Sequence, residues 1–200
     1  MNIRLSNIFF LSAGFFLASV AGTLSHEFGH YIVAKWYGCD PRISYAFTYY
    51  DCEGSDANYA WMTFGGPFIS MFLGSVGIIL LLMSGKNAEK KSYTWRNWCL
   101  VFLSLFWLRP VINAATLLLL IFLNGKISDT MDEIVIAKSL GWAWWSVLLV
   151  FALPGAAASL FVFFKKIPKD QRSNFILAGI IGGIGGSLLW MKSLGPLLLP

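Results

Sequence analysis

Charge is scarce in this sequence of 200 residues. Aspartate, glutamate, lysine and arginine together make up 12 %, about half of the roughly 25 % that soluble globular domains carry. Hydrophobic residues reach 57 %, well above the ordinary share. The composition therefore excludes an ordinary soluble domain and predicts an integral membrane protein surrounded by membrane lipids.

Cysteine and histidine are also rare, with three and two residues respectively. Because no Cys-x-x-Cys pair is present, the usual thiolate zinc sites are excluded. Cys39 and Cys52 flank one loop, where either a disulfide or two free thiols is compatible with the sequence. Cys99 lies at the start of a later apolar run, where we expect it to be buried by packing.

Long apolar runs are abundant. Five of them are long enough for helices that cross a hydrocarbon layer about 30 Å thick, which takes about 20 residues each. They cover residues 7–36, 62–84, 98–123, 142–164 and 174–191. We expect one all-α transmembrane domain over residues 1–200, with about five transmembrane helices and a short β-hairpin loop between the first two.

Charges in the connecting loops alternate in sign along the chain. Basic residues dominate the amino-terminal segment and the second and fourth loops: Arg4; Lys86, Lys90, Lys91 and Arg96, with Glu89 between them; and Lys165, Lys166, Lys169 and Arg172, with Asp170 between them. The first and third loops are acidic: Asp40, Asp51, Glu53 and Asp56; and Asp129, Asp132 and Glu133. This pattern predicts a cytoplasmic amino terminus, and we expect a bacterial inner membrane. The net charge of +5 then comes from basic loops that anchor the chain at the cytoplasmic face of the membrane, and no nucleic-acid partner is expected.

The two histidines of the chain belong to one motif near the end of the first apolar run. His26 and His30 are four residues apart, so both imidazoles project from the same face of a helix and can reach one ion. Glu27 follows the first histidine, where it can act as general base on a metal-activated water. This His-Glu-x-x-His spacing is the signature of zinc metallopeptidases, and ionisable groups inside a span are usually functional.

Two stretches resemble the site-2 protease family of intramembrane zinc metalloproteases. "HEFGHYIVAKWYG" from His26 resembles the first motif of that family, and "FGGPFISMFLGSV" from Phe64 is similar to the Gly-Pro motif of its next core helix. Membrane proteases of the CAAX-prenyl endopeptidase type share the pentapeptide but lack the Gly-Gly-Pro helix, and rank lower. The resemblance implies a membrane-embedded fold and zinc-dependent peptide hydrolysis. It also implies a histidine turn nearer the cytoplasm, whereas the loop charges put this turn near the outer face.

Gly65, Gly66 and Pro67 allow two interpretations. Proline suits the first turn of a helix, and glycines let another backbone approach closely. Gly66, Ser70 and Gly74 also form a stripe of small residues suited to helix packing. The three residues of the Gly-Gly-Pro motif are our candidates for substrate binding, together with the loop at 43–61 as an edge on which an unwound substrate pairs.

A catalytic zinc site usually has three protein ligands, and the third is not evident here. Site-2 proteases supply an aspartate within an Asn-Pro-Asp-Gly or Leu-Asp-Gly sequence, which this chain lacks. The segment "ISDTMDEIVIAKSLG" from Ile127 offers three acids. Asp132 is favoured because the run after it resembles that of compact bacterial relatives. Asp129 is the next candidate, and Glu133 suits a capping box with Thr130.

The sequence thus predicts a zinc-dependent intramembrane endopeptidase, a hydrolase acting on peptide bonds of membrane-embedded substrates. Zn²⁺ would be held by His26, His30 and Asp132, with Glu27 as the catalytic base. The alternative is a catalytically inactive zinc-binding scaffold or regulator of the same family. Arg109 and Asn113 lie deep in a span but are not assigned to the site. The partners expected are a transmembrane protein substrate and, through close helix packing at the glycines of the last span, a homodimer.

Overall fold

Five helical spans dominate the computed structural model, which describes residues 5–50, 52, 56–84, 93–125, 127 and 129–200. Each is long and apolar enough to cross a membrane, which confirms the predicted number. The first span is α1 (Leu5–Trp36) and the second is α2 (Asp56–Met83). Between them lies the predicted hairpin of β1 (Arg42–Ile43) and β2 (Thr48–Tyr49).

The later spans are interrupted by 3₁₀ or π turns. The third comprises α3 (Trp95–Ser104), the 3₁₀ turn η2 (Leu105–Trp107) and α4 (Leu108–Asn124). The fourth comprises α6 (Trp144–Phe161) and η3 (Val162–Lys166). The fifth runs through η4 (Lys169–Gln171), α7 (Arg172–Ala178), η5 (Gly179–Gly185), α8 (Gly186–Leu189), η6 (Trp190–Leu194) and α9 (Gly195–Leu198). A short helix, α5 (Asp132–Ser139), connects the third and fourth spans.

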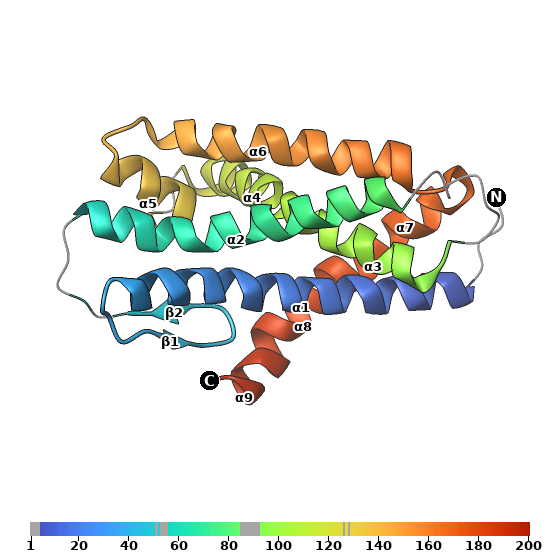
Figure 1. Ribbon diagram of the computed structural model, residues 1–200, viewed down its shortest axis with the longest axis horizontal. Helices are drawn as coiled ribbons and strands as arrows, with labels where there is room; N and C mark the ends of the chain where they lie inside the picture. Colours follow the sequence, from blue (N-terminus) through green and yellow to red (C-terminus); the bar gives the residue numbers. More distant parts are fainter. Residues whose placement is uncertain (1–4, 51, 53–55, 85–92, 126, 128) are drawn as a thin grey trace.

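The two ends of the bundle differ in the segments that they carry. The start of α1, the end of α2 and the turn between α6 and α7 lie at one end, whereas the hairpin and α5 lie at the other (Figure 1). The basic and acidic segments that the structure describes are therefore separated as the alternating charges predict. Several charges of that pattern lie outside the described side chains: Arg4, Asp51, Glu53, Asp56, Lys86, Glu89, Lys90 and Lys91.

The interior of the bundle contains many polar side chains, whereas its surface is largely apolar. Large apolar side chains such as Phe122 and Ile184 are exposed on the spans, and Cys99 is exposed with them rather than buried as expected. The buried polar residues are His26, Glu27, His30, Ser44, Thr63, Ser70, Asn97, Ser104, Glu133 and Asn174. Apolar surface on this scale is unfavourable in water, whereas lipid accommodates it. The arrangement is that of a multi-pass membrane protein.

The helices α1 and α2 cross in close contact where both carry glycine. A Cβ on Gly29 or on Gly65 would clash with the other's carbonyl oxygen, so the small-residue packing interpretation holds at Gly65. Pro67, however, lies inside α2 and not in its first turn. The helix begins earlier than expected because Ala60 and Met62, which precede the proline, are buried. Their packing offsets the missing hydrogen bond of an internal proline.

The hairpin folds back along α1. Arg42 pairs with Tyr49 in an antiparallel register, and both strands contact α1. The last span holds the turn of the hairpin, because the indole of Trp190 donates a hydrogen bond of 3.0 Å to the carbonyl oxygen of Tyr45, and the Tyr45 N–H donates one of 2.9 Å to Leu199. The hairpin therefore lies against the bundle at the level of the His-Glu-x-x-His turn. From residue 56 onward the proposed edge is helical, because α2 begins there, and residues 51 and 53–55 of that edge lie outside the described residues.

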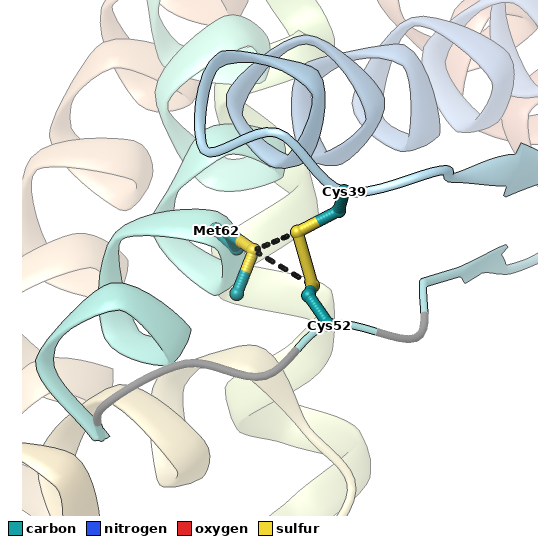
Figure 2. Close-up of a disulfide and its surroundings, with 3 residues drawn as sticks. All are labelled: Cys39, Cys52 and Met62. Carbon is teal, nitrogen blue, oxygen red and sulfur yellow. Dashed lines mark hydrogen bonds between the residues drawn. A yellow bond between two sulfur atoms is a disulfide. The ribbon is translucent and has the colours of Figure 1, made fainter.

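A disulfide joins the two ends of the hairpin segment. Cys39 and Cys52 are bonded, with their Cα atoms 5.2 Å apart, which decides between the two alternatives left by the sequence. The Sδ of Met62 on α2 lies 3.7 and 3.8 Å from the two sulfurs (Figure 2). Because a disulfide has no thiol hydrogen, these are packing contacts. The hairpin is thus tied both to the end of α1 and to the start of α2.

Reducing this disulfide should destabilise the protein measurably. The bond closes a segment with a sequence separation of 13 residues, for which a loss of about 3 kcal/mol in the free energy of unfolding is expected. Thermal unfolding in detergent, with and without a reductant, measures the effect. Cys99→Ser is the matched control because Cys99 is a free thiol. If the reductant leaves the melting temperatures of the wild type and of Cys99→Ser unchanged, the disulfide does not stabilise the protein.

Glycines of the last span pack against α1 of the same chain. A Cβ on Gly182 would clash with the backbone of Ser12, and one on Gly186 would lie 2.7 Å from Cδ2 of Phe16. Close helix contact, as predicted for these glycines, therefore occurs within one chain at both positions. The homodimer remains a prediction.

Candidate metal centre

The His-Glu-x-x-His residues occupy one turn of α1 that faces α2 and α5. His26, Glu27 and His30 are 2 %, 5 % and 6 % exposed. The two imidazole rings are nearly perpendicular, with centroids 4.8 Å apart, as close as the four-residue spacing predicts. One potential ligand atom from each of the three residues lies within 4.8 Å of the others, which is close enough to surround a single ion.

The Nδ1 atoms of both histidines are held by α2. His30 Nδ1 donates a hydrogen bond of 2.9 Å to the carbonyl oxygen of Met62, and His26 Nδ1 lies 3.1 Å from Ser70 Oγ. A carbonyl only accepts, so the proton of the neutral His30 ring is on Nδ1 and the lone pair on Nε2. Partners of this kind orient metal-binding histidines. The contacts therefore aim both Nε2 atoms at the same point.

Asp132, the first residue of α5, meets the imidazoles at that point. Its Oδ2 lies 2.8 Å from His26 Nε2 and 3.6 Å from His30 Nε2. Burial acts to raise the pKa of the Asp132 carboxyl, but the neighbouring imidazoles of His26 and then His30 outweigh burial and hold that pKa below its usual range. Two nitrogens and one carboxylate oxygen thus converge, which is a common ligand set for catalytic zinc.

The other two candidate ligands point elsewhere. Asp129 is exposed and accepts a hydrogen bond of 2.6 Å from Lys138. Glu133 is buried and accepts one of 3.0 Å from Asn113 Nδ2, while burial raises the pKa of its carboxyl. The residue that caps α5 is Met131, so Glu133 is not in a capping box with Thr130 as the sequence suggests. Of the three acids, only Asp132 contacts both imidazoles.

Glu27 lies between the hairpin and the third span. Thr48 Oγ1 is 3.1 Å from Glu27 Oε2 and 2.8 Å from the Glu27 carbonyl oxygen, so one hydroxyl hydrogen serves both acceptors. On the other side, Arg109 Nη2 is 3.9 Å from Glu27 Oε1. The carboxylate is therefore held beside the histidines by one hydrogen bond and one longer electrostatic contact.

The space at the Nε2 atoms exists because residue 66 is glycine. A Cβ on Gly66 would lie 2.6 Å from His26 Nε2 and closer still to His30 Nε2. The neighbouring Pro67 and Ser70 line a small cavity beside His26. Zinc fits this donor set, since it prefers imidazole nitrogen and carboxylate oxygen in a tetrahedral arrangement with one open position. The three substrate-binding candidates are thus a packing residue, Gly65, and two residues beside the site; their role in substrate binding stays a prediction.

Several residues of the site escape sequence reasoning because they reach it through long-range contacts. Thr48 and Met62 carry no local signal, and the sequence marks Ser70 only as a small packing residue. Arg109 and Asn113 do carry a signal as polar residues within an apolar span, which is not enough to assign them to the site.

Comparison with protein-family models, with curated proteins and with solved structures gave no match to this chain. The features of this chain that bear on its function are therefore the geometry of the metal centre and the sequence motifs that form it.

Proposed function

We propose that this chain is a zinc-dependent endopeptidase that hydrolyses peptide bonds of membrane-embedded proteins. The observation that carries the proposal is the convergence of His26 Nε2, His30 Nε2 and Asp132 Oδ2 on one point. Glu27, which follows His26 on α1, adds a fourth polar group close to them. The resemblance to site-2 proteases supports the same function. A purely structural cluster needs no second carboxylate within reach of both imidazoles.

A zinc ion held by the two histidines and Asp132 would polarise the scissile carbonyl and acidify a water molecule. Glu27 is the general base. It takes a proton from the attacking water as the water oxygen bonds to the carbonyl carbon. It then gives this proton to the amide nitrogen as the carbon–nitrogen bond breaks. Thr48 holds one carboxylate oxygen of Glu27 through its hydrogen bond and so keeps the base oriented.

The hairpin provides a substrate platform in this proposal. A helical substrate must unwind before hydrolysis, because its amides are already hydrogen-bonded within the helix. An extended segment is then stabilised by pairing with an edge of the β1–β2 sheet, beside the Thr48 that contacts Glu27. Gly66 and Pro67 line the side of the site formed by α2.

The location proposed is a bacterial inner membrane with the amino terminus in the cytoplasm. The disulfide between Cys39 and Cys52 supports this orientation, because disulfides persist outside the reducing cytoplasm. The hairpin and the histidine turn then lie toward the outer face.

A zinc-binding scaffold or regulator without catalysis is the competing function. Its supporting observation is the burial of Glu27, which is 5 % exposed, since a substrate must reach this carboxylate. Catalysis therefore requires the hairpin or α5 to move away from α1, whereas a scaffold does not require this motion.

Removal of the metal tests the proposed function. We expect purified protein to hold about one zinc per chain and to cleave a single-span membrane protein reconstituted with it in vesicles. Chelation by 1,10-phenanthroline should abolish cleavage, and added zinc should restore it. Protein that binds zinc but cleaves no single-span protein would favour the scaffold. Absence of metal would contradict both functions.

A further inference from the structure

Arg109 stands at a rigid break in the third span, just after the junction of η2 and α4. Trp107 fixes the break against two neighbouring helices. A Cβ on Gly74 would lie 2.6 Å from Trp107 Cδ1, and one on Gly155 would lie 2.5 Å from its carbonyl oxygen. The indole of Trp107 also donates a hydrogen bond of 3.1 Å to Ser75. These contacts fix the direction in which the next turn presents Arg109.

The guanidinium of Arg109 lies beside the metal centre, but its hydrogen-bonding capacity is not used up by the carboxylates there. Nη2 is 3.9 Å from Glu27 Oε1, longer than the roughly 2.7–2.9 Å of a charge-assisted hydrogen bond. Asp132 and Glu133 are the other carboxylates that act electrostatically on it. Its Nε is buried without a hydrogen-bond partner in the described part of the chain. N–H groups of the Arg109 guanidinium therefore remain available to donate hydrogen bonds inside the bundle.

The Arg109 side chain also borders a small cavity beside the metal centre. The cavity has a volume of about 10 Å³ and is lined by His26, Ser70, Arg109, Asn113 and Glu133, among others, which is about the space of one water molecule. Glu133 is 1 % exposed, and its Oε2 also lacks a partner in the described residues. The Arg109 side chain thus borders this cavity, and its Nη2 also lies near the carboxylate of Glu27.

A purely structural arginine should look different. An unpaired charge within a span is costly, and structural guanidinium groups relieve this cost through short, often bidentate, contacts with carboxylates. Arg109 has carboxylates within electrostatic range, yet its closest ion pair is the long one with Glu27, and its side chain is 30 % exposed. An anion that forms during the reaction would supply the short contact.

We propose that Arg109 is a catalytic residue whose Nη2–H donates a hydrogen bond to the scissile carbonyl oxygen as that oxygen becomes anionic. The proposal rests on the proposed hydrolytic function. As the water oxygen bonds to the carbonyl carbon, the π electron pair moves to the carbonyl oxygen and the water proton moves to Glu27. The pair returns when the carbon–nitrogen bond breaks and the departing nitrogen takes the proton. Arg109 remains protonated throughout.

The expected effect is large because the charge exists only in the transition state and the intermediate. Removing one donor from an oxyanion site lowers kcat by about 10²–10³-fold. An interaction of this kind leaves ground-state binding nearly unchanged. We therefore expect Arg109→Ala to lower kcat by about 10²-fold or more, with KM and zinc content close to those of the wild type.

The experiment compares Arg109→Ala and Arg109→Lys with Arg96→Ala, which removes an exposed arginine at the start of the same span. Cleavage kinetics are measured on the single-span protein in vesicles, and zinc per chain is measured in each variant. Lysine should recover part of kcat because it keeps the charge without the planar fork. Arg96→Ala should match the wild type.

The binding of two small molecules that coordinate zinc provides a measurement that does not depend on turnover. A phosphinic peptide built on the cleaved sequence carries an anionic tetrahedral centre, and its affinity should fall about 10²-fold in Arg109→Ala. The affinity for imidazole, a neutral ligand, should not change. Equal affinity for the phosphinic peptide, unchanged kcat, or loss of zinc in both Arg109 variants would overturn the role of Arg109. If the wild type neither holds zinc nor cleaves, the hydrolytic function itself fails and this role with it.

Discussion

Replacing Glu27 with glutamine should abolish cleavage and leave the zinc in place. Glutamine has almost the same shape as glutamate and can still accept the hydrogen bond from Thr48, but it cannot take a proton from water. Loss of a general base typically costs about 10²–10⁴ in rate. We expect about 10³-fold or more here, because Asp132, the other carboxylate at this turn, is engaged by both imidazoles and does not replace the base.

The measurement pairs cleavage of the single-span protein with zinc content. Asp170→Asn is the matched control, since it makes the same carboxylate-to-amide change at an exposed position in the turn between α6 and α7. Zinc at the wild-type level with cleavage lost supports catalysis by Glu27. Cleavage by Glu27→Gln at the wild-type rate would exclude Glu27 as the base and leave the peptidase without a mechanism.

The parts of the site that depend on helix geometry could be predicted from the sequence. Four-residue spacing puts His26 and His30 on one face, and the rings are indeed 4.8 Å apart. The five spans are predicted by the lengths of the apolar runs, because the thickness of the bilayer sets how many consecutive apolar residues a span needs. The loop charges also predict that Asp132 and this turn lie at the same end of the bundle, and Asp132 does contact both imidazoles.

Features that depend on contacts between distant segments could not be predicted. The apolar pattern predicts the second span from residue 62, yet α2 begins at residue 56, and Ala60 and Met62 near its start are buried by packing. The role of Thr48 depends on a hairpin that folds back along α1, and no local pattern encodes that direction. The choice among three acids depends on where α5 begins. With Asp132 as its first residue, the helix directs this carboxylate and not that of Asp129 toward α1.

Loss of the Asp132 carboxylate should remove the third zinc ligand. Asp132→Asn should reduce zinc affinity more than the about 10–100-fold expected for loss of an outer partner of a ligand, and should abolish cleavage. His30→Ala should do the same, because each substitution removes one of the three converging donor atoms. Asparagine keeps the shape of the side chain, so the loss measures the negative charge of the ligand and not a cavity.

Asp129→Asn is the internal control for this experiment, because Asp129 is exposed and pairs with Lys138. It should leave zinc content and cleavage within about twofold of the wild type, as surface ion pairs contribute little. Zinc titration against a competing chelator ranks the three variants. If Asp129→Asn loses zinc while Asp132→Asn retains it, the assigned ligand set is wrong. Since Asp129 is held by Lys138 near the end of α5, such a result would also require this ion pair to break when the metal binds.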